Sequence, residues 1–350
     1  MNKRKKKLCV IGHFAFGQQM YDGQTVKTRI ITKELEKSFG NTEIEKIDTY
    51  GGKKVLFKVV GNLFNATKHC QNIIIFPAQN GLKIIGPLCK VFSKLFKNNV
   101  HYVVIGGWLP EFLKSNKWLI SIIADYQGLY VESNKMKEVL NQEGLFNVYI
   151  MPNCKELPKL KESELTFFYN PPFKFCTFSR VMKEKGIEDA VEAVKIINEK
   201  NDKELCSLDI FGQVDSNQGK WFDDLRKGFP KYIDYKGIVP FDKSTEVLKD
   251  YFALLFPTYY DGEGFAGTLI DAFAAGVPTI ASDWKYNSEI VNDNVTGKVI
   301  PAKDVNALVK AMEEAIANPD EWNEMKYKSL ENAKNFLPEN VISILKSNLK

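Results

Sequence analysis

The sequence predicts an α/β protein built from two Rossmann-like, doubly wound halves. Short, continuous apolar runs alternate with helical patterns along most of the chain, which is typical of parallel sheets with right-handed crossover helices. This alternation stops once, across a proline-containing stretch near the middle, and then restarts. A chain of 350 residues is too long for one ordinary domain of this kind and comfortable for two.

The elements of the first half follow from these patterns. Residues 8–11 form a continuous apolar run that suits a strand buried on both faces. A helix is expected to open at Gly23 and to end at Gly40, with Val26, Ile30, Ile31 and Leu35 on one face. Further strands are expected at 73–76, 102–105, 129–131 and 148–150, and further helices at 53–64, 82–96, 111–123 and 135–142.

The alternation breaks over residues 151–169, which contain Pro152, Pro158 and mixed charges, and Pro171-Pro172 follow. We therefore place an interdomain linker there. Strands are then expected at 173–178, 207–211, 232–235, 253–256 and 279–281, and helices at 187–198, 244–251, 268–275 and 305–316. The predicted domains are 1–165 and 166–325, and helical residues 326–350 are expected to pack back on the first half.

Composition excludes several classes of protein. The chain is 44% hydrophobic and 26% charged, as in ordinary globular proteins. The six cysteines are scattered without metal-ligand spacing, so we interpret them as small buried apolar residues. No apolar run approaches the roughly 18 residues of a membrane span, and the N-terminus resembles a basic tail followed by a strand more than a signal peptide. We expect a cytoplasmic protein.

Positive charge is unevenly distributed, although the net charge is only +5. Residues 3–7 are all Lys or Arg, and a second basic region places Lys90, Lys94 and Lys97 beside Phe92 and Phe96. Both regions are explained equally well as solvent-exposed faces that lie over an ordinary hydrophobic core. No nucleic-acid recognition motif accompanies the charge, so we expect no nucleic-acid partner. A basic, aromatic surface instead favours peripheral contact with the anionic inner face of the cell membrane.

The most informative stretch is residues 257–284, PTYYDGEGFAGTLIDAFAAGVPTIASDW. A strand is expected to end at residue 256, and a loop rich in glycines and carboxylates leads into a helix that begins near Thr268. Glycines at 262, 264 and 267 allow close approach of the backbone to a ligand. The helix start directs unpaired N–H groups toward the same loop, which makes a general anion site.

Two acidic residues in this stretch, Glu263 and Asp271, have both structural and functional interpretations. Thr268 and Asp271 have the spacing of a capping box, and Glu263 is also explained as a solvated loop charge. A glycine-rich loop before a helix occurs in many phosphate-binding proteins, including dinucleotide enzymes. The residues alone leave these alternatives open.

Residues 263–282, EGFAGTLIDAFAAGVPTIAS, resemble the donor-site signature of retaining glycosyltransferases of family four, which have the GT-B fold. The resemblance implies that Glu263 contacts hydroxyls of the transferred sugar. It also implies that the backbone at Gly264, Phe265 and Ala266, together with the helix start at Thr268, holds sugar and phosphate. The second acid of the family motif is commonly Glu, and here Asp271 stands in its place with a shorter reach toward the ribose.

A second stretch, residues 178–193, FSRVMKEKGIEDAVEA, resembles the strand, arginine and lysine–glycine turn of the same family. By this match Arg180 and Lys185 bind the donor diphosphate, and cations there stabilise the charge that a leaving diphosphate develops. The alternative is two exposed charges at a turn. Smaller matches place Ile238 beside the nucleotide base and Gly23 beside the phosphates.

The resemblance implies transfer of a sugar, with retention, from a nucleoside diphosphate to a hydroxyl acceptor in bacterial polysaccharide assembly. UDP-sugars are the favoured donors, the acceptor is expected to be a saccharide or a lipid-linked saccharide, and neither a metal nor another cofactor is expected. Many relatives carry a histidine after a first-domain strand. Here Gly106, Gly107 and Trp108 stand there, and His13 is either a substitute or a hydrogen-bonded loop residue. A nucleotide-sugar epimerase and a non-catalytic donor-binding subunit are the alternatives.

Overall fold

The computed structural model describes residues 6–18, 20, 22–158 and 160–349, and the chain divides into two compact units. Unit 1 comprises Met1–Glu156 and Leu337–Lys350, and unit 2 comprises Leu157–Phe336. The boundary lies inside the expected linker, ahead of the position 165/166. Residues 326–336 stay with unit 2, and only residues 337–350 belong to unit 1. The basic residues 3–5 lie outside the described part of the chain.

Unit 1 contains a six-stranded parallel sheet in the order β2-β1-β3-β4-β5-β6. Successive strands are added on one side of β1 up to β2 and on its other side from β3 onward, so the switch point of the sheet lies between β1 and β3. Ligands bind at this position in sheets of this type. The strands are β1 (Lys6–Gly12), β2 (Ile44–Asp48), β3 (Cys70–Ile75), β4 (Asn99–Val103), β5 (Gly128–Val131) and β6 (Val148–Ile150).

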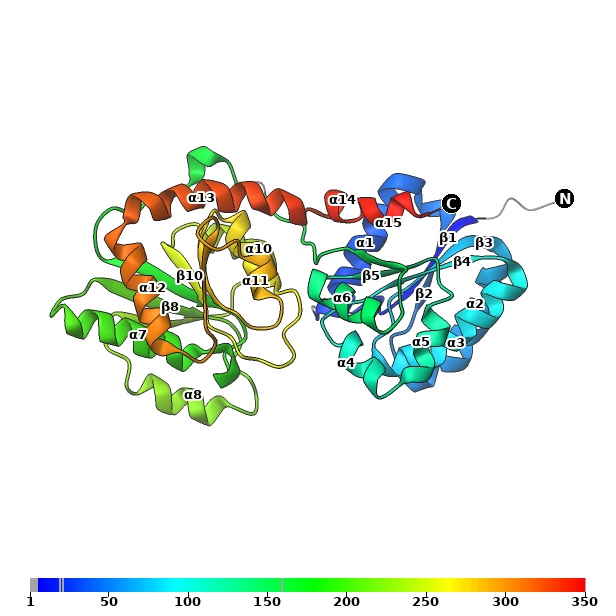
Figure 1. Ribbon diagram of the computed structural model, residues 1–350, viewed down its shortest axis with the longest axis horizontal. Coiled ribbons are helices and arrows are strands. Elements are labelled where there is room, and N and C mark those ends of the chain that lie inside the picture. The colour runs from blue at the N-terminus through cyan, green and yellow to red at the C-terminus, as the bar shows by residue number, and fades with distance from the viewer. Residues whose placement is uncertain (1–5, 19, 21, 159, 350) are drawn as a thin grey trace. The chain divides into compact units, whose positions relative to one another are not determined.

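Helices cover both faces of this sheet (Figure 1). On one face α1 (Gly23–Phe39) packs with α14 (Pro338–Val341) and α15 (Ser343–Ser347), where Ile31 and Leu35 share a core with Val341 and Leu345. The side chain of Asp22 caps α1 by accepting a hydrogen bond from the backbone N–H of Thr25. The remaining helices are α2 (Leu56–His69), α3 (Gln79–Phe96), α4 (Leu109–Lys114), α5 (Ile120–Ile123) and α6 (Asn134–Gln142).

Unit 2 contains a second six-stranded parallel sheet, in the order β12-β11-β10-β7-β8-β9. The strands are β7 (Phe173–Phe178), β8 (Cys206–Phe211), β9 (Ile233–Gly237), β10 (Ala253–Phe256), β11 (Thr279–Ser282) and β12 (Gly297–Ile300). The order in which strands are added switches sides between β7 and β10, so the carboxyl ends of these two strands mark the expected ligand position. The prediction of two doubly wound α/β halves is confirmed.

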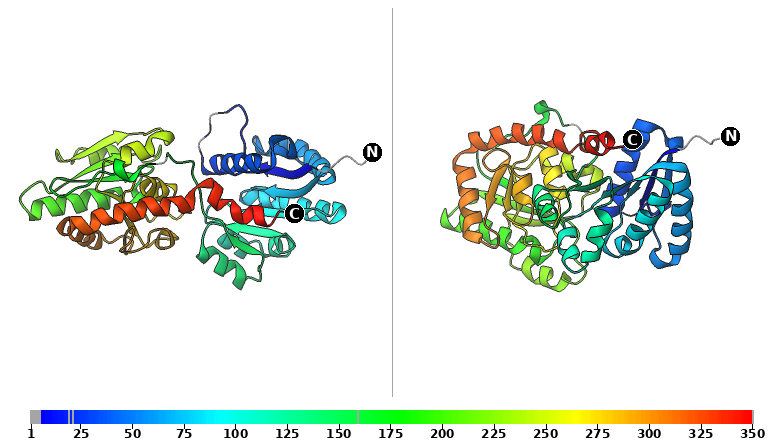
Figure 2. Two further views of the ribbon diagram at one scale, coloured as in Figure 1. Left: turned by 90° about the horizontal axis from the view of Figure 1, so that it is seen from above. Right: turned by 45° about the vertical axis from the view of Figure 1, so that its right-hand side comes forward.

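Two apolar cores lie on opposite faces of the second sheet, and Figure 2 shows the helices that cover them. Helices α7 (Ile187–Lys200), α8 (Gly219–Arg226) and α12 (Val305–Ala317) supply one core. The other core is built by α9 (Ser244–Leu248), α10 (Gly267–Ala274) and α11 (Asn287–Ile290), with the end of α13 (Pro319–Ala333). All six cysteines are free and buried, as predicted.

The sequence prediction missed two of the four edge strands, β2 and β12. An edge strand has a neighbour on only one side, so its residues are partly solvated and need not form a continuous apolar run. The burial of β2 is accordingly partial, and its sequence IEKID mixes charged with apolar residues. The short helices α8 and α11 were not predicted either.

The single helix predicted over 111–123 is wrong, because α4 and α5 are separate helices joined by a short 3-10 turn. Helix α4 ends at Lys114, before Ser115 and Asn116. The side-chain amide of Asn116 donates to the carbonyl of Phe112 at 2.8 Å, which takes up an acceptor that a continuing helix would use.

Candidate active site

The predicted site residues of unit 2 gather at the carboxyl ends of β7 and β10, two adjacent parallel strands. Ser179 and Arg180 follow β7 directly, and the loop from Pro257 to Ala266 follows β10 and leads into α10. The topology therefore brings together two sequence stretches that lie about 80 residues apart, at the switch point of the sheet.

Glycines allow the loops at these strand ends to lie close together. Gly186 has a φ of +70°, and a Cβ placed there would lie 2.4 Å from the carbonyl oxygen of Pro257. Gly212, after β8, has a φ of +135°, and its Cβ would lie 1.8 Å from the carbonyl oxygen of Ser179. Both positions therefore require glycine. The backbone N–H of Tyr259 also donates to the carbonyl of Glu184 at 2.8 Å, which joins the two stretches directly.

We expect Gly186→Ala to destabilise unit 2 by more than about 1 kcal/mol, because the new methyl group meets backbone atoms at a positive φ. Gly219→Ala is the matched control, since a Cβ there has no neighbour within 4 Å. Denaturant unfolding of the two variants measures the difference. Equal stability of both variants would contradict the close approach at Pro257.

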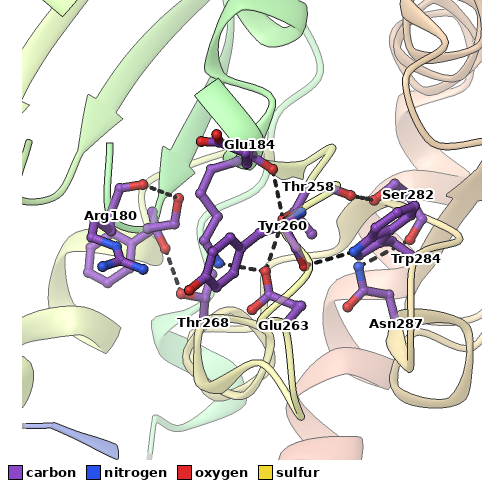
Figure 3. A network of polar contacts seen from close by, with 12 residues as sticks. Arg180, Glu184, Thr258, Tyr260, Glu263, Thr268, Ser282, Trp284 and Asn287 are labelled. Carbon is purple, nitrogen blue, oxygen red and sulfur yellow. Dashed lines mark hydrogen bonds and ion pairs between the residues drawn. The ribbon is translucent and has the colours of Figure 1, made fainter. Parts of the chain in front are cut away.

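A buried ion pair occupies the centre of the site (Figure 3). Lys185 Nζ lies 2.5 Å from Glu263 Oε2, and each side chain is only 9% exposed. The interpretation of both residues as solvated charges is therefore wrong. Lys185 Nζ also lies 5.4 Å from the ring centre of Phe256 and 5.2 Å from that of Tyr260, so aromatic faces supply the rest of its surroundings.

Arg180 is held more loosely than Lys185. Its side chain is 47% exposed, with Nη1 3.6 Å from Asp215 Oδ2. Its guanidinium carbon lies 5.5 Å from the ring centre of Tyr260. Arg180 and Lys185 thus approach the same aromatic ring, one half-exposed and one buried. The half-exposed guanidinium keeps donors available for an anion that arrives from solvent.

The start of α10 faces the end of β7. Helix α10 begins at Gly267 with Ala266 as its N-cap, and the hydroxyl of Thr268 donates to the carbonyl of Phe178 at 2.6 Å. The first N–H groups of a helix have no partner within the helix and favour anions. Gly264 and Phe265 lie in the preceding loop, and the Phe265 ring packs in the core against Phe336.

The capping-box interpretation of Thr268 and Asp271 is wrong. Helix α10 has no side-chain cap, and Asp271 lies beyond its first turn. Asp271 is 3% exposed and accepts a hydrogen bond from the Ser244 hydroxyl at 3.0 Å, which ties α10 to α9. Helix α10 ends at Ala274, one residue before the predicted end, and the predicted left-handed stop at Gly276 is confirmed by its φ of +63°.

A small pocket of about 140 Å³ lies between the ends of β7, β8 and β9 and the start of α10. Ile238 is 67% exposed and lies at the pocket. The pocket has an apolar aromatic wall and glycine backbone, which suits a flat ring. Its lining residues are Phe178, Ser179, Phe211, Gly212, Ile238, Val239 and Thr268.

Gly23 and His13 belong to unit 1, so they form a group separate from the residues above. Gly23 opens α1 and is exposed, and a Cβ placed there would have no neighbour within 4 Å. His13 Nδ1 lies 2.7 Å from the Thr25 hydroxyl, which donates to Asp22 Oδ2 at 2.6 Å. Because that hydroxyl has one proton, Nδ1 of His13 acts as the donor to it. Partial burial favours a raised pKa for Asp22, but the hydrogen bonds from Thr25 outweigh it and lower the pKa.

The residues that sequence reasoning missed form the support of the ion pair (Figure 3). Thr258 donates its hydroxyl to Glu263 Oε2 at 2.9 Å, and Ser282 donates to the carbonyl of Thr258. Trp284 Nε1 donates to the carbonyl of Tyr260 at 2.8 Å. Thr258, Ser282 and Trp284 are polar residues at the ends of β10 and β11, and that position is the only signal in the sequence that could have indicated them.

Together these residues form a candidate site for an anion and for hydroxyl groups, at the switch point of a Rossmann-like unit. Cations, helix amides and a flat pocket are suited to a nucleoside diphosphate, and a buried carboxylate is suited to hydroxyl groups. A family model described as "Glycosyl transferases group 1" matches residues 159–334. The chain belongs to this family.

Comparison with known proteins supports this family assignment. The chain is 26% identical over 294 residues to the UDP-N-acetylglucosamine–peptide N-acetylglucosaminyltransferase GtfA subunit of Streptococcus gordonii, covering 77% of this chain and 55% of that protein. It is 30% identical over 152 residues to a GDP-mannose-dependent phosphatidylinositol monomannoside mannosyltransferase of Mycobacterium tuberculosis, covering 41% of this chain and 38% of that protein.

The fold is shared over nearly the whole chain with a solved structure. HepE of Anabaena, in complex with UDP, superposes with a TM-score of 0.74 at 12% identity, covering 98% of this chain and 99% of that one. The GT-B prediction is thereby confirmed. The chain spans about half the length of the curated relatives it matches. Within the described residues, no helix is both long and apolar enough to cross a membrane.

Proposed function

We propose that the chain is a glycosyltransferase that moves a sugar, with retention, from a nucleoside diphosphate to a hydroxyl acceptor. The observation that carries this proposal is the pairing of Lys185 with Glu263 beside Arg180, at the switch point of unit 2. In the proposed complex Arg180 and the α10 amides bind the diphosphate and stabilise the charge that develops as it leaves. Glu263 accepts hydrogen bonds from hydroxyls of the sugar.

The pocket beside Ile238 is proposed to take the base, and Gly264, Phe265 and Ala266 to offer backbone contacts to the sugar and phosphate. Asp271, through Ser244 and α9, is proposed to support the ribose side of the site rather than to cap a helix. Retention follows if the leaving phosphate itself accepts the proton of the acceptor hydroxyl on the same face. In this scheme, the group that accepts the proton belongs to the nucleotide-sugar substrate.

UDP-sugars are the proposed donors, with no further cofactor. HepE has also been solved in complex with UDP-glucose, and the name of the streptococcal relative specifies UDP-N-acetylglucosamine. The mycobacterial relative is named for GDP-mannose and a lipid-linked acceptor. These names support a nucleotide-sugar donor. For the acceptor we propose a saccharide or lipid-linked saccharide in cell-surface polysaccharide synthesis.

The experiment that tests this function is a thermal-shift screen with UDP, GDP and NAD. A ligand that binds only the folded state, present at 100 times its Kd, stabilises that state by about 2.7 kcal/mol. We expect UDP or GDP to raise the Tm and NAD to leave it unchanged. A shift with NAD, and none with any nucleoside diphosphate or nucleotide sugar, would contradict the proposal.

We also propose that unit 1 contacts an anionic membrane surface through α2 and α3. Residues 49–110 contain eight lysines and no Asp or Glu. The aromatic residues expected on this surface are not available for membrane contact, because Phe92 and Phe96 pack on Phe64. Phe57 is 92% exposed, and Val91 and Leu95 are 60% and 65% exposed. Lys90 and Lys94 both pair with Asp125, whereas Lys58 and Lys83 have no ion-pair partner among the described residues.

We expect the protein to bind vesicles that contain phosphatidylglycerol, and to dissociate as salt rises, because charges are screened beyond about 10 Å at 0.1 M salt. Each lysine near such a surface contributes about 1 kcal/mol, so reversing Lys58 and Lys83 together should weaken binding more than ten-fold. Phe57→Ser should also weaken it, whereas Phe146→Ser, at a residue 83% exposed outside α2 and α3, is the control. Flotation at low salt measures binding. A wild-type protein that stays free of these vesicles would exclude the surface.

A further inference from the structure

Thr258 lies at the point where β10 ends, and its hydroxyl is completely buried. Three polar atoms surround its Oγ1. Glu263 Oε2 lies at 2.9 Å, the carbonyl oxygen of Glu184 lies at 3.2 Å, and the backbone N–H of Tyr260 approaches at 3.2 Å. This one side chain therefore contacts both sequence stretches that build the site.

A threonine hydroxyl has one proton, so these contacts cannot all be donated by it. The N–H of Tyr260 donates to Oγ1, which leaves the carboxylate and the carbonyl as competing acceptors. The carbonyl of Glu184 already accepts from Tyr259 at 2.8 Å. The carboxylate is closer and charged, and a hydrogen bond to a charged acceptor is the stronger of the two. The proton of Thr258 is therefore directed to Glu263.

The two oxygens of Glu263 then differ. Oε2 accepts from both the Thr258 hydroxyl and Lys185 Nζ, whereas Oε1 has no hydrogen-bond partner among the described residues. A carboxylate fixed through one oxygen presents the other in a defined direction. A carboxylate held by the flexible lysine alone would keep rotational freedom that must be lost when a ligand binds.

The backbone of Thr258 is fixed as well (Figure 3). The Ser282 hydroxyl donates to its carbonyl, and Asn287 Nδ2 donates to the carbonyl of Ser282 at 3.1 Å. Ser282 and Asn287 are completely buried. The hydroxyl of Thr258 is thus a rigid donor supported from β11 and α11, rather than a mobile surface group.

We propose that Thr258 is a positioning residue that fixes Oε2 of Glu263, so that Oε1 is the single oxygen presented to the donor sugar. This inference rests on the proposed function. The role is specific to the sugar: the hydroxyl acts on the carboxylate and has no contact with Arg180 or with the pocket beside Ile238. Loss of the hydroxyl is therefore expected to affect the rate of the reaction and to leave nucleotide binding unchanged.

The test compares Thr258→Val with Thr258→Ser, and uses Thr177→Val as a matched control. Thr177 is also buried in unit 2, but its Oγ1 has no hydrogen-bond partner. Release of UDP from UDP-N-acetylglucosamine and UDP-glucose gives kcat and KM, calorimetry gives the Kd for UDP, and a thermal scan gives the Tm.

We expect a ten-fold to hundred-fold lower kcat in Thr258→Val, the range for loss of a hydrogen bond to a charged group. The Kd for UDP should be unchanged, and Thr258→Ser should restore most of the rate. Equal kcat in Thr258→Val and Thr177→Val, in an enzyme whose wild type is active, would overturn the inference alone. So would a loss of Tm and UDP affinity that Thr258→Ser does not rescue. A wild type that neither binds UDP nor releases it would overturn the proposed function itself.

Discussion

Replacing Arg180 with alanine is expected to lower kcat/KM for the nucleotide sugar by about a hundred-fold to a thousand-fold, about 2.7–4 kcal/mol of transition-state stabilisation. The physical reason is that a leaving diphosphate gains negative charge, and the guanidinium offers paired donors to it. Arg180→Lys should recover only part of the loss, because an ammonium group cannot make the planar two-point contact. Initial rates of UDP release measure the effect.

The fold should tolerate this change. Arg180 is 47% exposed and its ion pair with Asp215 is 3.6 Å long, so it contributes little to stability. Arg226→Ala is the matched control, since that arginine also lies over aromatic rings but is on α8. A rate close to wild type in Arg180→Ala would mean that the diphosphate binds elsewhere.

Replacing Lys185 with alanine is expected to have a large effect on stability as well as on turnover. Lys185 and Glu263 are each 9% exposed and lie 2.5 Å apart, and removing one partner of a buried pair typically costs about 3–5 kcal/mol, because the remaining charge is unpaired. For a unit of this size, the Tm should fall by roughly 6–20 °C. Thr258 retains one hydrogen bond to the carboxylate and offsets part of this loss.

The double variant Lys185→Met, Glu263→Gln separates the two effects. It removes both charges while keeping similar volumes, so stability should recover substantially, while turnover should stay low because both proposed site groups are absent. Thermal unfolding and UDP release on the same samples give the comparison. A single Lys185→Ala variant as stable as wild type would mean that the buried pair does not hold the two loops together.

The sequence was sufficient to predict the architecture because most of its strands are buried on both faces. β7 and β10 begin and end where their apolar runs do, and Gly40 and Gly276 end helices as expected. The edge strands β2 and β12 were missed because partial solvation removes the continuous apolar run. The end of α4 depends on the side chain of Asn116, which a helical pattern does not reveal.

The site was predicted in part. Arg180, Lys185 and Glu263 lie at one switch point, as the two stretches implied, but the sequence could not show that Lys185 and Glu263 are buried against each other. That burial depends on Gly186, whose missing Cβ lets the turn approach Pro257. Thr258 was missed because its role depends on which hydrogen-bond acceptors the fold brings within reach. Asp271 was assigned to a cap because the true start of α10 lies one residue earlier than expected.

The central claim is that this site breaks the bond between a sugar and a nucleoside diphosphate with retention, and one measurement tests it most directly. The protein is incubated with UDP-α-glucose or UDP-α-N-acetylglucosamine, with water as the acceptor, and the products are followed by proton NMR from the earliest times. We expect free UDP and a sugar that appears first as its α-anomer, with the rate lowered by about a hundred-fold to a thousand-fold in Arg180→Ala. A sugar that appears first as the β-anomer, or a nucleotide sugar that is epimerised but not cleaved, would contradict it.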